Sequence, residues 1–120
     1  MDLHAAVDAD VALEPGTIAL VPTGIQIAIP DGFEAQVRPR SGQTFRTALG
    51  IPNAPGTVDS DYAEEWMVIV RNDGAGPRRI VHGERIAQAV FARYVAPMLA
   101  EGEVGRTTER AGGFGSTGKH

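Results

Sequence analysis

Short apolar runs, separated by glycine and proline, recur along the whole chain. Residues 24–29 read GIQIAI, with isoleucine at every second position, and residues 33–37 alternate in the same way. Because successive side chains of a strand point to opposite faces, a period of two predicts half-buried strands in both segments. Apolar and β-branched runs predict further strands at 17–21, 66–71, 78–81 and 85–95. Many short strands separated by turns predict an all-β sandwich or barrel.

Two segments depart from this simple pattern. Residues 41–48, SGQTFRTA, are the one candidate for a short helix, and Ser41 is its expected N-cap. A β-hairpin is expected to begin after Pro55-Gly56 and to continue as extended chain, which would place Asp59 and Asp61 on the same side.

Composition narrows the class of protein. The chain has 120 residues, of which 42% are hydrophobic and 22% charged, and these values predict one soluble domain. Cysteine is absent, which excludes disulfides and thiol catalysis and suits the cytoplasm. Acidic residues at the start of the sequence, with no apolar core after them, do not predict a signal peptide, and no apolar run is long enough for a membrane span. A net charge of −4 argues against direct nucleic-acid binding but allows a small phosphorylated ligand held by local arginines.

The segment RPRSG, residues 38–42, is a candidate anion site. Arginine offers forked donors to phosphate, and the N–H groups that open a helix also favour an anion. On this segment alone, a surface turn with solvated arginines is an equally good interpretation. Gln88 is polar within an apolar run, so it needs partners, which are either backbone groups or a phosphate.

The segment NAPGTVDSDY, residues 53–62, carries a different set of groups. The amide of Asn53 can donate and accept hydrogen bonds, as reading a pyrimidine edge requires. A carboxylate here can orient and deprotonate a water molecule. A turn-rich hairpin with side-chain caps is the alternative for this segment taken alone.

The sequence ERAGGFGSTGKH, residues 109–120, matches the spacing of a phosphate-binding loop from Gly113 to Lys119. His120 follows in place of Ser or Thr, and no predicted strand precedes the loop, so the match is not a P-loop. Glycines still allow N–H groups to converge on an anion, and Phe114 can stack on a planar base. Plain disorder is the alternative.

Taken in order, these segments closely resemble the five motifs of the homotrimeric dUTPase family. The motifs correspond to MDLHAA (1–6), PRSG (39–42), NAPGTVDSDY (53–62), GERIAQ (83–88) and RAGGFGSTG (110–118). The resemblance implies an all-β, jelly-roll-like dUTPase fold with one short helix after PRSG. It also implies a core over 1–97, followed by a connector and a C-terminal arm over 98–120 that closes over a neighbouring subunit's site.

The same resemblance implies a dUTP diphosphatase that releases dUMP and pyrophosphate. Asp59 would hold the water that attacks the α-phosphorus, and Asp2 would face Mg2+ through waters. Residues implied to read the uracil and the deoxyribose are Asn53, Gly56, Val58 and Tyr62. Residues implied to bind the phosphate chain are Arg40, Ser41, Gly42 and Gln88. Residues implied to close over the nucleotide are Arg110, Phe114, Gly115, Ser116 and Thr117.

Departures from the family pattern keep two alternatives open. Met1 directly precedes Asp2 where the family has a glycine and an earlier strand, and Ala63-Glu64 replaces the usual Arg-Gly. One alternative is a dCTP deaminase-like enzyme of the same fold, although the NAPG and GGFGSTG segments favour dUTPase. The other is a non-catalytic, trimeric, dUTP-binding regulatory protein.

Overall fold

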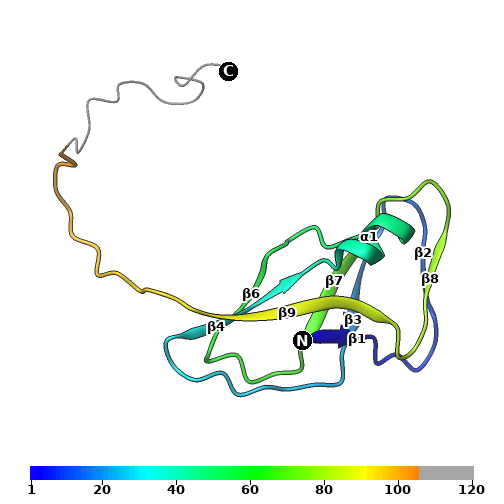
Figure 1. Cartoon of the computed structure of the whole chain (residues 1–120), viewed down its shortest axis with the longest axis horizontal. Helices are drawn as coiled ribbons and strands as arrows, with labels where there is room; N and C mark the ends of the chain where they lie inside the picture. The colour runs from blue at the N-terminus through cyan, green and yellow to red at the C-terminus, as the bar shows by residue number, and fades with distance from the viewer. Residues whose placement is uncertain (106–120) are drawn as a thin grey trace.

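The computed structural model describes residues 1–105 as a β-protein with one short helix (Figure 1). In chain order the elements are β1 (Asp2–His4), β2 (Val11–Leu13), β3 (Ile18–Pro22), β4 (Phe33–Arg38), α1 (Ser41–Thr47), β5 (Leu49–Gly50), β6 (Gly56–Val58), β7 (Met67–Asn72), β8 (Arg78–Ile80) and β9 (Arg85–Arg93). The all-β class and the short helix after PRSG are therefore confirmed.

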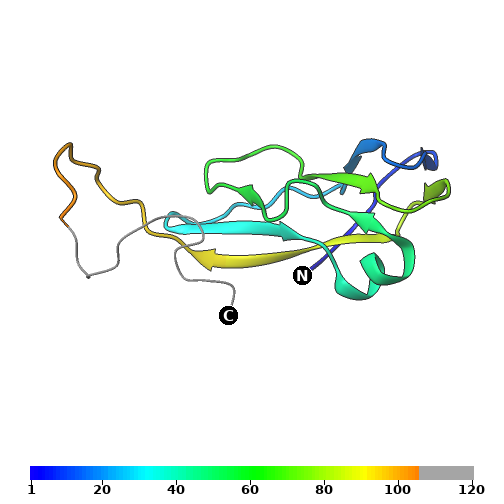
Figure 2. The ribbon, with the colours of Figure 1, turned by 90° about the horizontal axis from the view of Figure 1, so that it is seen from above.

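All the strand pairs are antiparallel, and they form three sheets. The largest has the order β1-β9-β4-β6, the second β3-β7-β5, and the third contains β2 and β8. Figure 2 shows β4 and β9 in one layer and β7 in another. In the largest sheet Gln88 lies opposite Asp2 on one side and opposite Arg38 on the other. The pairing of β9 thus brings three distant segments of the sequence together.

The core lies between these sheets, and the apolar run predicted at 66–71 contributes every second side chain to it. On β7, Val68 and Val70 are buried, whereas Met67 is exposed. Trp66, which immediately precedes this strand, is 2% exposed and belongs to the core. Full burial of such side chains contributes about 1.5–3 kcal/mol each, so this sheet interface supplies much of the folding free energy.

The prediction of a strand at 24–29 is wrong, although the side chains of this segment do alternate between the core and the solvent. Ile29 is buried, and Ile25 and Ile27 pack against the core, while the residues between them are exposed. Within residues 1–105, the one backbone–backbone hydrogen bond of this segment runs from the Trp66 N–H to the Ile25 carbonyl, at 2.9 Å. Alternation of apolar and polar residues indicates which side chains are buried. A β-strand also needs a neighbouring strand whose backbone forms hydrogen bonds along its length.

Helix α1 begins differently from the prediction. Its N-cap is Arg40, with no side-chain capping bond, so Ser41 lies inside the first turn. At the other end Ala48 adopts a left-handed conformation, with φ 51°, and its N–H donates to the Thr44 carbonyl at 2.9 Å. Glycine is the residue usually found at this position because it lacks the Cβ that makes the conformation costly.

Replacing Ala48 with glycine should therefore stabilise the protein. Relief of the left-handed Cβ contact is worth about 1–2 kcal/mol, and the added freedom of the unfolded chain offsets part of it, leaving about 0.5–1 kcal/mol. Urea unfolding would measure the gain. The control is Ala12→Gly in strand β2, where φ is not positive and glycine should be destabilising. Equal destabilisation by both substitutions would contradict the assignment of strain to Ala48.

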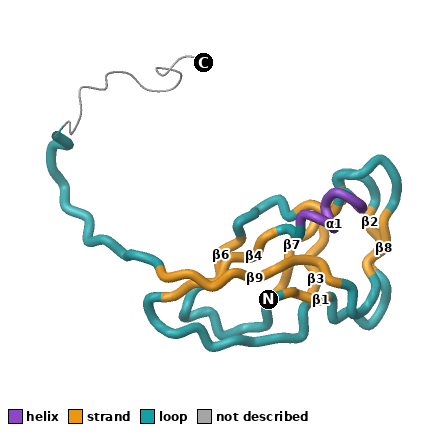
Figure 3. Tube along the Cα trace, viewed as in Figure 1, coloured by secondary structure: helices purple, strands orange, loops and turns teal. Residues whose placement is uncertain are grey.

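Beyond β9 the chain leaves the sheets. Residues 94–105 contain no helix or strand, and Met98 and Leu99 are almost fully exposed. Figure 3 shows this segment departing from the end of the fold opposite to helix α1. In the described part of the chain, no helix is long and apolar enough to cross a membrane.

Candidate functional site

One pocket, with a volume of about 300 Å3, gathers residues of the first, second and fourth predicted motifs. Its lining residues are Asp2, Arg40, Ser41, Gly42, Gln43, Arg46 and Gln88. We call it the anion pocket. Strand β1 reaches the pocket because it pairs with β9, and this pairing extends to Met1, whose ammonium donates to the Ala89 carbonyl at 2.9 Å.

The carboxylate of Asp2 is held by two arginines at the rim of the anion pocket. Arg40 Nε lies 3.0 Å from Asp2 Oδ1, and Arg85 Nη1 lies 3.4 Å from Oδ2. The side chains of Asp2 and Arg40 are 36% and 24% exposed, so the pair contributes at most about 1 kcal/mol to stability. The main effect of this ion pair is to orient Arg40, because it keeps the guanidinium of that residue at the mouth of the pocket.

Gln88 connects β9 to the loop that precedes α1. Its Nε2 donates to the Pro39 carbonyl at 2.9 Å. The sequence leaves two possible partners for Gln88, a backbone group or a phosphate, and in the structure its partner is a backbone group. This bond fixes the position of Arg40, the next residue along the chain, relative to the sheet.

A second pocket, also about 300 Å3 in volume, is formed by the third predicted motif. Its polar rim contains Asn53, Thr57, Asp59 and Tyr62, with Val58 beside them. Its apolar lining comes from Leu20, Trp66, Met67 and Ile69. We call it the base pocket. A half-apolar pocket with a few polar groups at its edge is typical of sites that bind a small molecule.

Close approach of two backbones shapes the base pocket. Gly56 is buried on β6, opposite Val37 of β4, and a Cβ at this position would lie 2.9 Å from the side-chain nitrogen of Asn53. A larger residue here would force the Asn53 amide to shift, so glycine leaves room for that amide. The exposed carboxylate of Asp59 follows directly after β6.

The extended chain that the sequence predicts through residue 62 is not present. The chain reverses after β6, and the Tyr62 N–H donates to the Asp59 carbonyl at 3.2 Å. The Tyr62 hydroxyl in turn donates to the Glu65 carbonyl at 3.0 Å. Asp and Ser are residues that favour turns, and the segment of Asp59, Ser60 and Asp61 follows directly after the end of β6 at Val58.

The two pockets share no lining residue. Within one chain, the predicted phosphate-binding groups line one pocket, and Asn53, Val58, Asp59 and Tyr62 line the other. The remaining predicted site residues lie outside the described residues: Arg110, Phe114, Gly115, Ser116 and Thr117.

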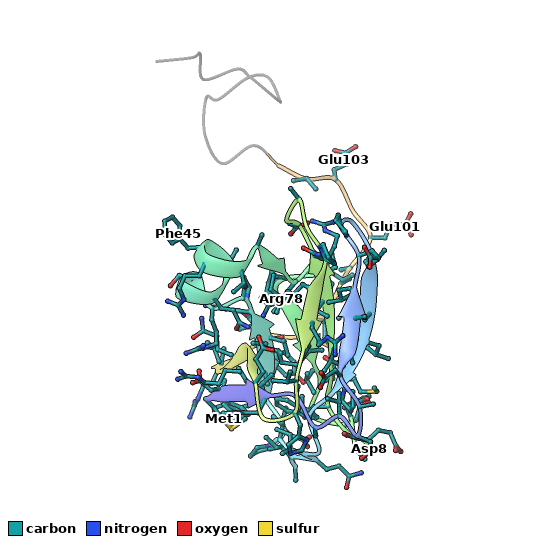
Figure 4. The ribbon with its side chains drawn as sticks, turned by 90° about the vertical axis from the view of Figure 1, so that its right-hand side faces the viewer. Met1, Asp8, Phe45, Arg78, Glu101 and Glu103 are labelled. Carbon is teal, nitrogen blue, oxygen red and sulfur yellow. The ribbon has the colours of Figure 1, made fainter. Side chains whose placement is uncertain are left out.

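Sequence reasoning missed two members of the anion pocket, Gln43 and Arg46. Gln43 is 7% exposed, and its Nε2 donates to Glu84 Oε1 at 3.2 Å. Glu84 also pairs with Arg78, which lies near the middle of the molecule in Figure 4. The helical spacing of residues 42 and 46 was a usable signal, because residues four apart lie on the same face.

An antiparallel β-fold with one pocket lined by two arginines and another lined by apolar and polar groups suits an all-β protein that binds a nucleotide. The dUTPase family model matches residues 2–118. The chain belongs to the dUTPase family, the enzymes that hydrolyse dUTP, which confirms the resemblance found in the sequence.

Curated relatives agree with this family. The deoxyuridine 5'-triphosphate nucleotidohydrolase of Solibacter usitatus (strain Ellin6076) is 50% identical over 119 residues, which span 99% of this chain and 80% of the relative. That of Thermoanaerobacter sp. (strain X514) is 50% identical over 98% of this chain and 80% of the relative.

Solved structures support the same fold. The dUTPase of Staphylococcus bacteriophage 80alpha, solved with dUpNHpp, is 28% identical and superposes with a TM-score of 0.84 over 98% of this chain and 84% of its own. A mutant dUTPase from phage phi11 of S. aureus, in which a structural Mg(II) ion is coordinated, gives a TM-score of 0.77 at 23% identity, covering 86% and 82% of the two chains.

Proposed function

We propose that this chain hydrolyses dUTP to dUMP and pyrophosphate in a site assembled from more than one copy. The observation that carries the proposal is the division of the required groups between two pockets that share no residue. One nucleotide must meet the phosphate-binding groups, the base-reading groups and the carboxylate at the same time. Joining the anion pocket of one copy to the base pocket of another satisfies this requirement.

Exposed apolar side chains support an assembly, which we propose to be a homotrimer. Leu20 and Met67 line the base pocket yet are 55% and 40% exposed, and Ile18 on the same sheet is 59% exposed. Phe91 and Tyr94 are similarly exposed at the far end of β9. Adjacent apolar groups of this size are typical of surfaces that another protein covers.

The base pocket is suited to uracil. Uracil and cytosine exchange a donor and an acceptor on one edge, so polar groups matched to uracil would remain unpaired against cytosine. In the proposal, the Asn53 amide and the backbone of β6 around Gly56 and Val58 read this edge. Tyr62 packs on the deoxyribose and leaves no space for a 2′-hydroxyl.

Asp59 is assigned to the chemical step. Its carboxylate orients a water molecule toward the α-phosphorus and accepts the proton as the oxygen attacks. A new bond forms between that oxygen and the α-phosphorus, and the bond from the α-phosphorus to the bridging oxygen breaks. Pyrophosphate leaves with the bonding electrons and dUMP remains. Asp59 also contacts the sugar 3′-hydroxyl, which aligns the nucleotide with the water.

The anion pocket positions the phosphate chain in this reaction. Arg40 is assigned to the phosphate oxygens with Ser41, Gly42 and Gln88. Attack at phosphorus depends on alignment and charge neutralisation more than on covalent help from the protein. The Asp2–Arg40 ion pair supports this role, because it places the guanidinium in advance of substrate binding.

The residues present fit a Mg2+ ion that arrives with the substrate. Residues 1–105 contain no cluster of three or more His, Cys, Asp or Glu that could form a complete metal cage. A single carboxylate, that of Asp2, lines the anion pocket. Mg2+ commonly keeps its waters and combines one or two carboxylates with substrate phosphates. Asp2 would hold the ion through water, and the ion would neutralise phosphate charge.

The C-terminal residues complete the proposal. We assign residues 1–97 to the core and 98–120 to a connector and an arm that closes over the site of a neighbouring copy. Arg110, Ser116 and Thr117 would bind the γ-phosphate, while Phe114 with Gly115 would cover the uracil. We place the reaction in the cytoplasm.

Pyrophosphate release from dUTP with Mg2+ tests the function directly. The full chain should turn dUTP over. A chain ending before Arg110 should do so at least about tenfold more slowly, because bulk water would remain in a site that the arm does not cover. Equal rates would contradict the closing arm. Ammonia release from dCTP would instead indicate a deaminase, and tight dUTP binding without turnover would indicate a regulatory protein.

A further inference from the structure

Arg46 has no assigned role in the proposed reaction, yet its guanidinium lies over the anion pocket. It lines this pocket and follows Gly42 by four residues on helix α1. Helical side chains lean toward the N-terminus of their helix, so Arg46 points back over the first turn. Its Nη1 and Nη2 lie 3.2 and 3.8 Å from the position that a Cβ of residue 42 would occupy. Its neighbour Phe45, 92% exposed, projects into solvent instead (Figure 4).

The charges of the pocket leave this arginine unpaired. Asp2 is the one carboxylate in the lining, and it already pairs with Arg40 and Arg85. Among residues 1–105, Arg46 forms no ion pair, so its charge remains available to a ligand. A triphosphate carries more negative charge than Arg40 can neutralise while it is bonded to Asp2. Arginine is well suited to the remaining oxygens because its planar fork matches phosphate.

The glycine at position 42 makes this arrangement possible. A side chain at residue 42 would crowd the guanidinium, whereas glycine lets it lie against the backbone beside Ser41. Helix α1 is itself tied to the turn before β9 by the buried Gln43, which donates to Glu84. The guanidinium is therefore carried by a fixed element beside Arg40, rather than by a loose loop.

We infer that Arg46 is a further cationic substrate-binding residue, in addition to Arg40 and Arg110, and that it makes the site selective for the triphosphate over the monophosphate. This inference rests on the proposed function of the anion pocket. A different role must be separated from it, because Arg46 also lies in the last turn of α1, where a positive charge stabilises the helix dipole. That structural role would not distinguish one deoxyuridine nucleotide from another.

Calorimetry on the full chain with Mg2+ separates the two roles. The non-hydrolysable analogue dUpNHpp and the product dUMP are titrated into the unaltered protein and into Arg46→Ala. Loss of a charge-assisted contact at an exposed site should weaken dUpNHpp about tenfold, while dUMP changes by less than about twofold. Arg46→Lys should recover more than half of the lost binding free energy of dUpNHpp. Alanine is a strong helix former, so the variant is expected to fold.

Arg79→Ala is the matched control, because Arg79 is exposed on β8 and lines neither pocket. It should leave both affinities unchanged. Equal weakening of dUpNHpp and dUMP by Arg46→Ala, or no weakening of either, would overturn the inference. If the unaltered protein itself fails to bind dUpNHpp, the proposed function fails first, and the two failures are thereby distinguished.

Discussion

Asp59→Asn should lower the turnover of dUTP by about a thousandfold while leaving the affinity for dUpNHpp within about threefold. Asparagine has the shape of aspartate and can still contact the sugar, but it cannot accept the proton of the attacking water. A positioned general base is worth about a hundred- to ten-thousandfold in rate, and the loss should appear in kcat rather than in KM. Pyrophosphate release at saturating dUTP gives kcat, and calorimetry gives the affinity.

Asp61→Asn provides the control for this experiment. Asp61 lies in the same turn and carries the same charge, but it does not line the base pocket. Its replacement should leave kcat within about twofold, since surface substitutions have small effects. Unimpaired turnover by Asp59→Asn would refute the role assigned to that carboxylate. An equal loss in both variants would show that the turn needs its negative charge rather than a base.

A mixture of two inactive variants should regain activity. Arg40→Ala damages only the anion pocket, and Asp59→Asn damages only the base pocket. If each site joins the anion pocket of one copy to the base pocket of another, unfolding and refolding the variants together creates some intact sites. In an equal mixture, about half of the copies have an intact anion pocket and the other half have an intact base pocket. About one quarter of the sites should therefore combine two intact pockets.

The control mixture combines Asp59→Asn with Asn53→Ala. Both substitutions lie in the base pocket, so every such pocket carries one of them whatever the assembly. No activity should return beyond that of the more active variant alone. If the first mixture also stays inactive although each protein refolds, the site is contained within a single copy and the proposed assembly is wrong.

The sequence predicted the strands that are long enough for burial to leave a hydrophobic pattern. The segments at 33–37, 66–71 and 85–95 correspond to β4, β7 and β9, because a strand that covers a core must alternate or be apolar throughout. Strands β2 and β5 have only three and two residues, too few for a period to appear. Their existence depends on pairing with β8 and β7, which is information from distant segments.

The candidate site was predicted unevenly for a related reason. Residue types suited to phosphate or uracil were recognised within each segment, but their division into two pockets depends on the pairing of β9 with β1 and β4. The turn at Asp59 and Arg40 as N-cap depend on local backbone geometry that residue preferences constrain only loosely. Arg46 was missed because its spacing of four residues from Gly42 indicates a shared helix face but does not show that this face lines a pocket.

The double pairing of β9 has an evolutionary consequence. Gln88 of β9 pairs with Asp2 of β1 on one side and with Arg38 of β4 on the other. The strand continues to Arg93 before the chain leaves the sheet. Insertion of a single residue within this strand would turn the following side chains to the opposite face. Changes of length should therefore accumulate, as related sequences diverge, in segments such as 73–77, which join strands without lining either pocket.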